Sequence, residues 1–320
     1  MRILNSAALS LLMACPLAAQ VAGPPTAEEA AGLRARVAES TRLGYEHSNL
    51  LIVPPGEGWK LGMVSWIAAG KNGETYLLHR GQEVDPIVAI DAQGRVLRSW
   101  GKGLFVMPHG IRVDPDGNVW TADAASSLVR KFSPQGLLLL TIEVGGQPSP
   151  CPNNFCSTTD IAFGPNGRLF VADGYANGRV VEYAPDGRKV KEWGSLGTGP
   201  GQMQVVHSLV VAPEGVVYVA DRENGRVHRF DLDGRLIGTW TGFGKTFSLA
   251  LDGDAIWLTT QPRNETNFAP GWLIKVDRAS GRMLGYVNSA GGHGVTVAPN
   301  GDILLGPGPN QVPARYRKLP

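Results

Sequence analysis

Short alternating runs of apolar and polar residues recur along this chain, and the stretch from His207 to Trp240 shows the repeating unit most clearly. It contains four segments rich in β-branched and aromatic residues, which are separated by turns rich in glycine, proline and aspartate. This pattern predicts four short antiparallel strands. One such sheet cannot bury its apolar faces alone, so neighbouring units of the same kind are required.

The unit recurs at intervals of roughly 40 to 50 residues, which is the spacing of propeller blades. Six first strands are expected to begin near Ser65, His109, Thr159, His207, Phe247 and His293. Two separate β-sandwiches are the alternative, but no proline-rich, serine-rich or charged linker interrupts the run from Leu51 to Pro320. The sequence therefore predicts an all-β fold, a six-bladed β-propeller, whose closed ring leaves almost no exposed sheet edge.

The N-terminal part of the chain is expected to complete this ring. The last unit is one strand short, and a strand within Asn49–Val53 is expected to close it. Thr26 and Glu29 form a capping-box pattern ahead of helix formers that extend to Leu43, which predicts a short helix before the propeller. The predicted organisation is a signal peptide at 1–20, an N-terminal segment with the helix at 21–48, and the propeller at 49–320.

Composition and charge narrow the class of protein. With 43% apolar residues, 18% charged residues and a net charge of +2, the chain is typical of a soluble globular protein and has no basic patch for nucleic acid. Arg2 followed by an apolar stretch indicates a secretory signal, because the stretch is too short to span a membrane. Cleavage near Ala19 and lipidation of Cys15, as in a bacterial lipoprotein, both fit this signal. We therefore expect a secreted or periplasmic monomer without a transmembrane span, with a lipid anchor as an open alternative.

Cys151 and Cys156 lie in the loop that leads into the third unit. Two close cysteines in an exported protein usually pair, so a local disulfide is expected. A metal site built on these cysteines is the poorer alternative.

Three of the six histidines occupy one repeat position, the start of a first strand: His109, His207 and His293. First strands line the channel of a propeller, and these three belong to alternate units, so their imidazoles should point at one spot on the axis. Three neutral imidazoles with an open fourth position are typical of catalytic zinc. Histidines that bond only the backbone are the alternative, but the intervening units carry other residues here. We predict a site for zinc or another divalent metal, and no role for His47, His79 and His228.

The second strands should end at the same mouth of the channel, because each runs antiparallel to its first strand. The residues at these ends include Arg80, Tyr175 and Arg222. Two guanidiniums beside a cation favour an anionic ligand, and a substrate carboxylate matches the two-pronged arginine. A tyrosine near arginine and metal can have a lowered pKa and serve as a base. The alternatives are that the Asp221-Arg222 dipeptide forms an ion pair with another blade and that Tyr175 is an aromatic residue of the rim.

Four segments carry a resemblance to a known family: His79–Gly81, Pro108–Asp123, Val171–Arg179 and His207–Arg226. They are similar to peptidyl-α-hydroxyglycine α-amidating lyase, the second catalytic unit of the animal peptide-amidating enzyme, within the broader NHL-repeat propellers. The resemblance is close over the first four units and looser over the last two. It implies an enzyme, a carbon–nitrogen lyase that splits a C-terminal α-hydroxyglycine into an amide and glyoxylate.

The resemblance also implies roles for single residues. The family's zinc-binding histidines match His109, His207 and His293. Its general base matches Tyr175, and its active-site arginines match Arg80 and Arg222. Zinc would polarise the α-hydroxyl, the tyrosinate would take its proton, and arginine would hold the carboxylate of a small-molecule or peptide substrate.

The chain departs from this family at several positions. Gly294 stands where the family has an aspartate that binds a structural calcium ion, which makes calcium doubtful here. Gly291–Gly292 replace a Met-Pro pair before the third histidine, and Ala176 replaces a cysteine after the tyrosine. Cys156 stands where the partner of that cysteine would be, so its pairing with Cys151 would be a local substitute. The natural substrate stays open.

Two other functions are compatible with a propeller of this kind. A non-enzymatic NHL-repeat propeller could bind a protein or carbohydrate at the cell envelope and keep the histidines by descent. A lactone-hydrolase-like propeller would hold calcium through Glu, Asn and Asp at the channel, where this chain offers histidines. Metal content separates the first alternative from the enzyme, because a scaffold need not contain zinc.

Overall fold

The computed structural model describes residues 23–146 and 151–320, which contain one α-helix, two short 3₁₀ segments and 26 strands. The predicted signal peptide at 1–20, with Cys15 and the cleavage site near Ala19, lies outside the described residues. No helix within these ranges has the length and apolar character needed to cross a membrane.

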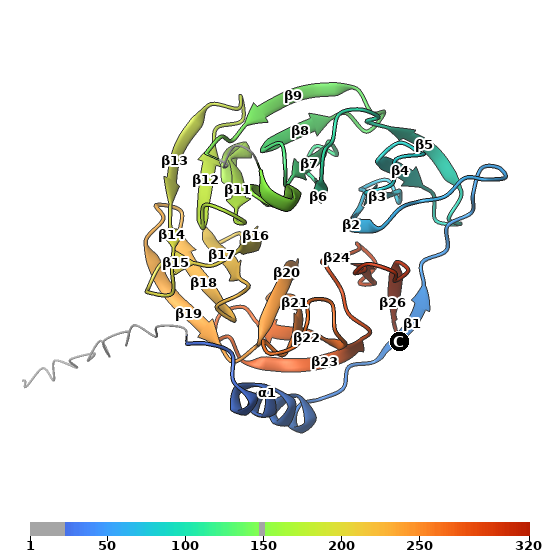
Figure 1. Ribbon diagram of the computed structural model, residues 1–320. Coiled ribbons are helices and arrows are strands. Elements are labelled where there is room, and N and C mark those ends of the chain that lie inside the picture. The colour runs from blue at the N-terminus through green and yellow to red at the C-terminus, as the bar shows by residue number, and fades with distance from the viewer. Residues whose placement is uncertain (1–22, 147–150) are drawn as a thin grey trace, which may run out of the picture.

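Six four-stranded sheets surround a central channel, as Figure 1 shows, so the predicted six-bladed β-propeller is confirmed. Blade 1 contains β2 (Val64–Ala69), β3 (Thr75–His79), β4 (Ile87–Ile90) and β5 (Val96–Trp100). Blade 2 contains β6 (Pro108–Val113), β7 (Val119–Asp123), β8 (Leu128–Phe132) and β9 (Leu138–Glu143). Blade 3 contains β10 (Thr158–Phe163), β11 (Leu169–Asp173), β12 (Arg179–Tyr183) and β13 (Lys189–Trp193).

The second half of the ring repeats this order. Blade 4 contains β16 (Val206–Val211), β17 (Val216–Asp221), β18 (Arg226–Asp231) and β19 (Leu236–Thr241). Blade 5 contains β20 (Lys245–Asp252), β21 (Ala255–Gln261), β22 (Gly271–Asp277) and β23 (Met283–Ser289). A small parallel pair precedes blade 4, formed by β14 (Ser195–Leu196) and β15 (Gln202–Met203).

Blade 6 combines both ends of the described chain: β24 (Gly294–Val297), β25 (Ile303–Gly306), β26 (Ala314–Lys318) and β1 (Tyr45–Asn49). A closing strand from the N-terminal side was expected, but its predicted position within Asn49–Val53 was wrong, and the ring begins at Tyr45 instead of at residue 49. The outermost strand of a blade faces solvent and therefore does not need apolar residues. The apolar Leu50 and Ile52 pack against blade 1 instead.

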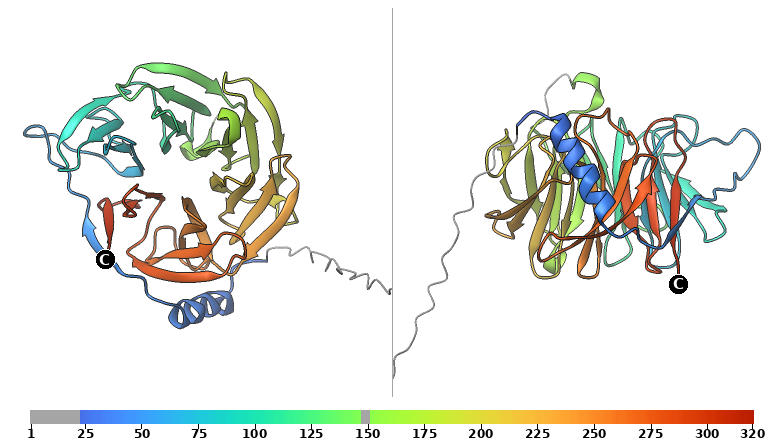
Figure 2. Two further views of the ribbon diagram at one scale, coloured as in Figure 1. Left: turned by 180° about the vertical axis from the view of Figure 1, so that it is seen from behind. Right: turned by 90° about the horizontal axis from the view of Figure 1, so that it is seen from below.

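The predicted helix is confirmed as α1 (Ala27–Glu39), which lies along the outside of the ring (Figure 2). The Thr26 hydroxyl accepts a hydrogen bond from the Glu29 amide at 3.0 Å, as the capping-box pattern indicated. Leu33 and Val37 are buried against the core that blades 4 and 5 share.

Arg112 of β6 joins the first strands at the centre of the channel. Its guanidinium forms a bidentate ion pair with Asp160, with Nε–Oδ1 at 2.9 Å and Nη2–Oδ2 at 2.7 Å. Each of the five remaining blades contributes one first-strand residue that contacts this guanidinium: Trp66, Asp160, Ser208, Leu249 and Val295. A single side chain thus connects all six blades beneath the mouth that carries the histidines.

Candidate metal centre

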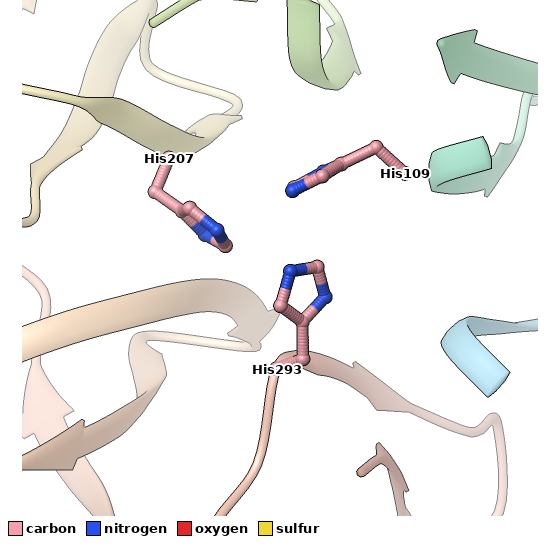
Figure 3. A group of neighbouring side chains, drawn as sticks. All are labelled: His109, His207 and His293. Atoms are coloured by element: carbon pink, nitrogen blue, oxygen red, sulfur yellow. The ribbon is translucent and has the colours of Figure 1, made fainter. Parts of the chain in front are cut away.

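Three histidines meet on the channel axis, as Figure 3 shows. His109 in β6, His207 in β16 and His293 directly before β24 have ring centroids 4.5 to 4.9 Å apart. All three are buried, and each offers a ligand nitrogen within 4.8 Å of the other two. The structure therefore brings the predicted metal ligands to one point.

A β-bulge explains why this repeat position faces the axis. In five blades the pairing of the first two strands skips one residue, and the skipped residues are Ser65, His109, Thr159, His207 and Phe247. A bulge leaves its extra residue unpaired and re-aims the side chain. In blade 6, His293 precedes the paired strand, and its backbone amide donates to the Gly306 carbonyl at 2.8 Å.

Each histidine is held in one tautomer by the neighbouring blade. Its Nδ1 lies next to the backbone carbonyl at the same repeat position of that blade. The three pairs are His109 with Thr159 (2.7 Å), His207 with Phe247 (2.5 Å) and His293 with Ser65 (2.8 Å). Because a carbonyl only accepts, Nδ1 donates and Nε2 keeps its lone pair. The backbone contacts that were the alternative to metal binding thus leave three acceptors at the axis, as metal-binding histidines require.

Burial lowers the pKa of all three imidazoles well below its usual range. The positive charge of Arg222 lowers all three pKa values further, and that of Arg80 lowers those of His109 and His293. Neutral imidazoles are the form that binds a metal ion. Three nitrogens around tetrahedral zinc, each about 2.1 Å from the ion, would lie roughly 3.4 Å apart. The ligand nitrogens lie within 4.8 Å of one another, so an inward movement of the rings would fit them to such an ion, and imidazole ligands suit several divalent metals.

Tyr175, in the loop after β11, lies beside two of these histidines. Its hydroxyl donates to Nε2 of His109 at 2.9 Å and lies 3.4 Å from Nε2 of His207. Burial raises the pKa of Tyr175, although the charges of Arg222 and Arg80 oppose this rise. The expectation of a lowered pKa is therefore not met by the protein alone, because burial outweighs the two arginines.

The two predicted arginines stack on aromatic rings around the histidines. The guanidinium of Arg222 lies 5.2 Å from the centre of the Phe247 ring and 5.8 Å from that of Tyr175. The guanidinium of Arg80 lies 5.3 Å from the centre of the Phe155 ring, and this ring packs 5.1 Å from Tyr175. Arg80, Tyr175 and Arg222 therefore share one mouth of the channel, as the strand positions predicted.

The hydrogen bonds of these arginines leave room for an anion. Nε of Arg80 donates to the Pro108 carbonyl at 3.0 Å, whereas its buried Nη2 has no hydrogen-bond partner among the described residues. Nε of Arg222 donates to Glu223 at 2.8 Å. Asp221 pairs with Arg226 at 2.7 Å, so the ion pairs of Asp221 and Arg222 stay within blade 4 and the inter-blade alternative is not supported. A buried donor without a partner is costly unless a ligand supplies the acceptor.

A disulfide and a buried histidine lie near this mouth. Cys151 and Cys156 form the expected disulfide, with Cα atoms 5.7 Å apart. His79 has a packing role, since its Nδ1 accepts the Gly81 amide at 2.9 Å and thereby holds the turn that carries Arg80.

Two aromatic residues of the mouth were not predicted from the sequence. Phe268 lies in the loop after β21, with its ring 5.4 Å from Phe247 and 5.7 Å from His293. Phe155 lies inside the disulfide loop. Neither residue occupies a repeat position; the pairing of the flanking cysteines was the only sequence signal that pointed to the loop of Phe155.

Comparison with known proteins supports a relationship to amidating enzymes. Residues 105–132 and 204–230 match the NHL repeat. The chain is 36% identical over 210 residues to peptidyl-glycine alpha-amidating monooxygenase of Mus musculus, which covers 56% of this chain and 22% of that protein. It is 35% identical over 211 residues to peptidyl-alpha-hydroxyglycine alpha-amidating lyase 1 of Drosophila melanogaster, covering 55% and 39%. Lyase 2 of the same fly is 27% identical over 287 residues, covering 78% and 69%.

The predicted resemblance is thus confirmed. The chain spans less than a quarter of the length of the mouse relative.

Solved structures show the same fold. Streptogramin B lyase superposes with a TM-score of 0.61 at 13% identity, covering 86% of this chain and 98% of that one. A gluconolactonase from Xanthomonas campestris has a TM-score of 0.56 at 13% identity, covering 87% and 97%. At such identity these neighbours show the propeller fold alone.

Proposed function

We propose that this protein is an exported lyase that uses zinc, or another divalent metal, to cleave α-hydroxyglycine compounds into an amide and glyoxylate. The convergence of three neutral Nε2 atoms with Tyr175 and two arginines carries the proposal. The relatives named as amidating lyases support it. His109, His207 and His293 would hold the metal.

The reaction needs no oxidant or reductant. The hydroxyl proton of R–CO–NH–CH(OH)–COO⁻ moves to Oη of Tyr175, and the electron pair of that O–H bond forms the C=O of glyoxylate. The C–N bond breaks, and its electron pair stays on nitrogen, which takes a proton to give R–CO–NH₂. A bound divalent cation supplies Lewis-acid polarisation of the hydroxyl, and its charge favours the tyrosinate over the phenol.

The arginines determine which end of the substrate faces them. The buried Nη2 of Arg80 lacks a partner, and a carboxylate would complete its hydrogen bonding. Arg222 is held rigidly between two rings and Glu223, so it can orient the same anion with little loss of side-chain freedom. The substrate carboxylate, which becomes that of glyoxylate, would lie at these two side chains.

Metal analysis and a glyoxylate-release assay with N-benzoyl-α-hydroxyglycine test this function. The purified protein should contain close to one divalent ion per chain and release glyoxylate and benzamide in equal amounts. His207→Ala should lose metal and activity together and keep the strand signal in circular dichroism. His47→Ala, on β1 far from the axis, is the matched control and should keep both. A metal-free wild type that releases no glyoxylate would favour the non-enzymatic propeller.

Export is the part of the proposal that rests on the first twenty residues and on the disulfide, which favours an oxidising compartment. The mass of the mature protein from cells distinguishes the two signals. Cleavage near Ala19 leaves an unmodified chain, whereas lipidation leaves a chain that begins at Cys15 and carries acyl groups. A full-length chain in the cytoplasm would overturn export.

A further inference from the structure

Two partly exposed phenylalanine rings, Phe155 and Phe268, lie at the mouth of the channel beside the candidate metal centre. Phe155 packs on Tyr175, and Phe268 packs on His293. We call these two residues the aromatic rim. Both residues belong to loops, and specific contacts hold each loop in place: a disulfide around Phe155 and hydrogen bonds from buried side chains next to Phe268.

The backbone of Phe268 is held in an unfavourable conformation. Its φ is +69°, in the left-handed region that bulky side chains rarely adopt. Gly308 and Gly291 allow this geometry, because a Cβ at Gly308 would lie 2.5 Å from Cβ of Phe268 and one at Gly291 would lie 2.3 Å from its carbonyl oxygen. Strain of this kind persists where the surroundings impose it, and it is concentrated at functional sites.

Buried polar side chains anchor the loop that carries Phe268. Nζ of Lys245 donates to Asn267 at 2.9 Å, and Nε2 of Gln261 donates to the Thr266 carbonyl at 2.6 Å. Lys245 and Gln261 are 7% and 2% exposed, so both donor side chains are buried. The residues directly before Phe268 are therefore fixed, and the ring has a defined place next to His293.

The loop of Phe155 is fastened covalently. The disulfide between Cys151 and Cys156 closes a ring of six residues that includes Phe155. The buried Cys156 anchors this ring, since its amide donates to the Ala124 carbonyl at 3.1 Å. Arg80 stacks on the phenylalanine from one side. Both members of the aromatic rim are thus positioned before any ligand binds.

We propose that the aromatic rim selects substrates whose amide nitrogen carries an aromatic or large apolar acyl group. The inference rests on the proposed function, in which the histidines face the hydroxyl and the arginines face the carboxylate. The acyl group is the remaining large substituent, and it must leave the centre through the mouth. A fixed aromatic surface there favours an apolar group that stacks on it.

Paired substrates measure this selectivity. The wild type should process N-benzoyl-α-hydroxyglycine with a kcat/KM about tenfold above that for the N-acetyl compound, because one stacked ring contributes roughly three- to tenfold. Phe268→Ala and Phe155→Ala should each reduce this ratio at least threefold. Phe268→Leu, which keeps apolar bulk, should reduce it less and serves if the alanine variant does not fold. Phe163→Ala is the control, since this partly exposed phenylalanine ends β10 at the far end of the channel.

A binding experiment separates the inference from the proposed function. N-benzoylglycine and N-acetylglycine lack the hydroxyl and cannot react, so calorimetric binding to the metal-loaded protein reads the aromatic rim alone. Tighter binding of the benzoyl compound, reduced by Phe268→Ala, supports selection even without turnover. The inference would be overturned if the wild type had equal kcat/KM values for the two reactive compounds and equal affinities for the two unreactive ones. The lyase function would remain supported in that case. Absence of glyoxylate with both reactive compounds would instead count against the lyase function.

Discussion

At the scale of single residues, the carbonyl that meets each histidine Nδ1 is as important as the histidine itself. The carbonyls of Ser65, Thr159 and Phe247 come from blades without a histidine at this position. They orient the imidazoles and leave Nε2 as the acceptor nitrogen at the axis, so the six repeat positions together form one centre. A metal ion needs both groups, because a ligand of unfixed orientation binds weakly.

Arg222→Lys tests whether the arginines recognise a carboxylate. Lysine keeps the charge but loses the planar fork and its stacking on Phe247 and Tyr175, so kcat/KM should fall by about 10- to 100-fold. Arg235→Lys, at a side chain that is 77% exposed, should leave kcat/KM unchanged. Steady-state glyoxylate release measures both variants. If the methyl ester of the substrate reacted as well as the free acid, the arginines would serve the fold instead of the chemistry.

At the scale of elements, side chains connect the turns of neighbouring blades. Glu74, directly before β3, accepts hydrogen bonds from Arg98 of β5 at 2.9 Å and from the Tyr76 hydroxyl at 2.8 Å. Nε of Arg98 also donates to the Pro134 carbonyl of blade 2 at 2.8 Å. The bond to Arg98 is the main cause that lowers the pKa of Glu74 to about 2. This small network therefore couples blade 1 to blade 2 through one ionised carboxylate.

Glu74→Gln should lower the free energy of unfolding by about 1.5–3 kcal/mol at pH 7, which is the range for hydrogen bonds to charged groups. The folded pKa of Glu74 lies below its unfolded value, so its contribution is complete above the unfolded pKa and is lost as the pH falls towards about 2. The difference between wild type and variant should thus shrink between about pH 4.5 and pH 2. Urea unfolding at several pH values measures it, with the exposed Glu83→Gln as control. A difference that is constant with pH would contradict the role of the charge.

At the scale of the whole molecule, the ring is closed at its rim by β1 and joined at its centre by Arg112. The guanidinium donates to the Leu249 and Val295 carbonyls at 3.2 and 3.3 Å and pairs with the buried Asp160. The channel centre thus has its own positive charge, which meets backbone carbonyls and a carboxylate, the groups that a structural calcium ion prefers. Stability should therefore depend on Arg112 and not on calcium.

Arg112→Ala should cost about 3–5 kcal/mol of unfolding free energy, because it leaves the Asp160 carboxylate buried without its cation. Arg112→Ala combined with Asp160→Ala should cost less than the sum of the two single changes, since the partners interact directly. Denaturant unfolding with matched slopes measures all three variants. Additive costs would show that the ion pair does not join the blades.

Calcium should not change the melting temperature of the wild type. The guanidinium already meets the carbonyls at the centre, and Gly294 offers no carboxylate. Thermal melts with millimolar calcium and with a calcium-selective chelator should coincide. A rise of several degrees with calcium would reveal a binding site for this ion and contradict the expectation.

Much of the fold and of the candidate metal centre could be predicted from the spacing of equivalent residues in the repeats. A blade is a local structure of about 45 residues, so its strands, its turns and the inward-facing repeat position can be read from neighbouring residues. The shared mouth of Arg80, Tyr175 and Arg222 was predictable as well, because antiparallel pairing places the start of one strand beside the end of the next. The disulfide was also predictable, since its two cysteines are five residues apart.

Contacts between distant segments decided the rest. The closing strand at Tyr45–Asn49 is polar and faces solvent, so only its pairing with β26 reveals it. The sequence does not distinguish Arg112 from other strand residues. Its role depends on the closed ring, in which the first strands of all six blades surround its side chain. The positions of Phe155 and Phe268 depend on loops without periodicity. The direction in which the pKa of Tyr175 shifts depends on burial. Burial is a property of the assembled ring, so a local sequence pattern does not reveal it.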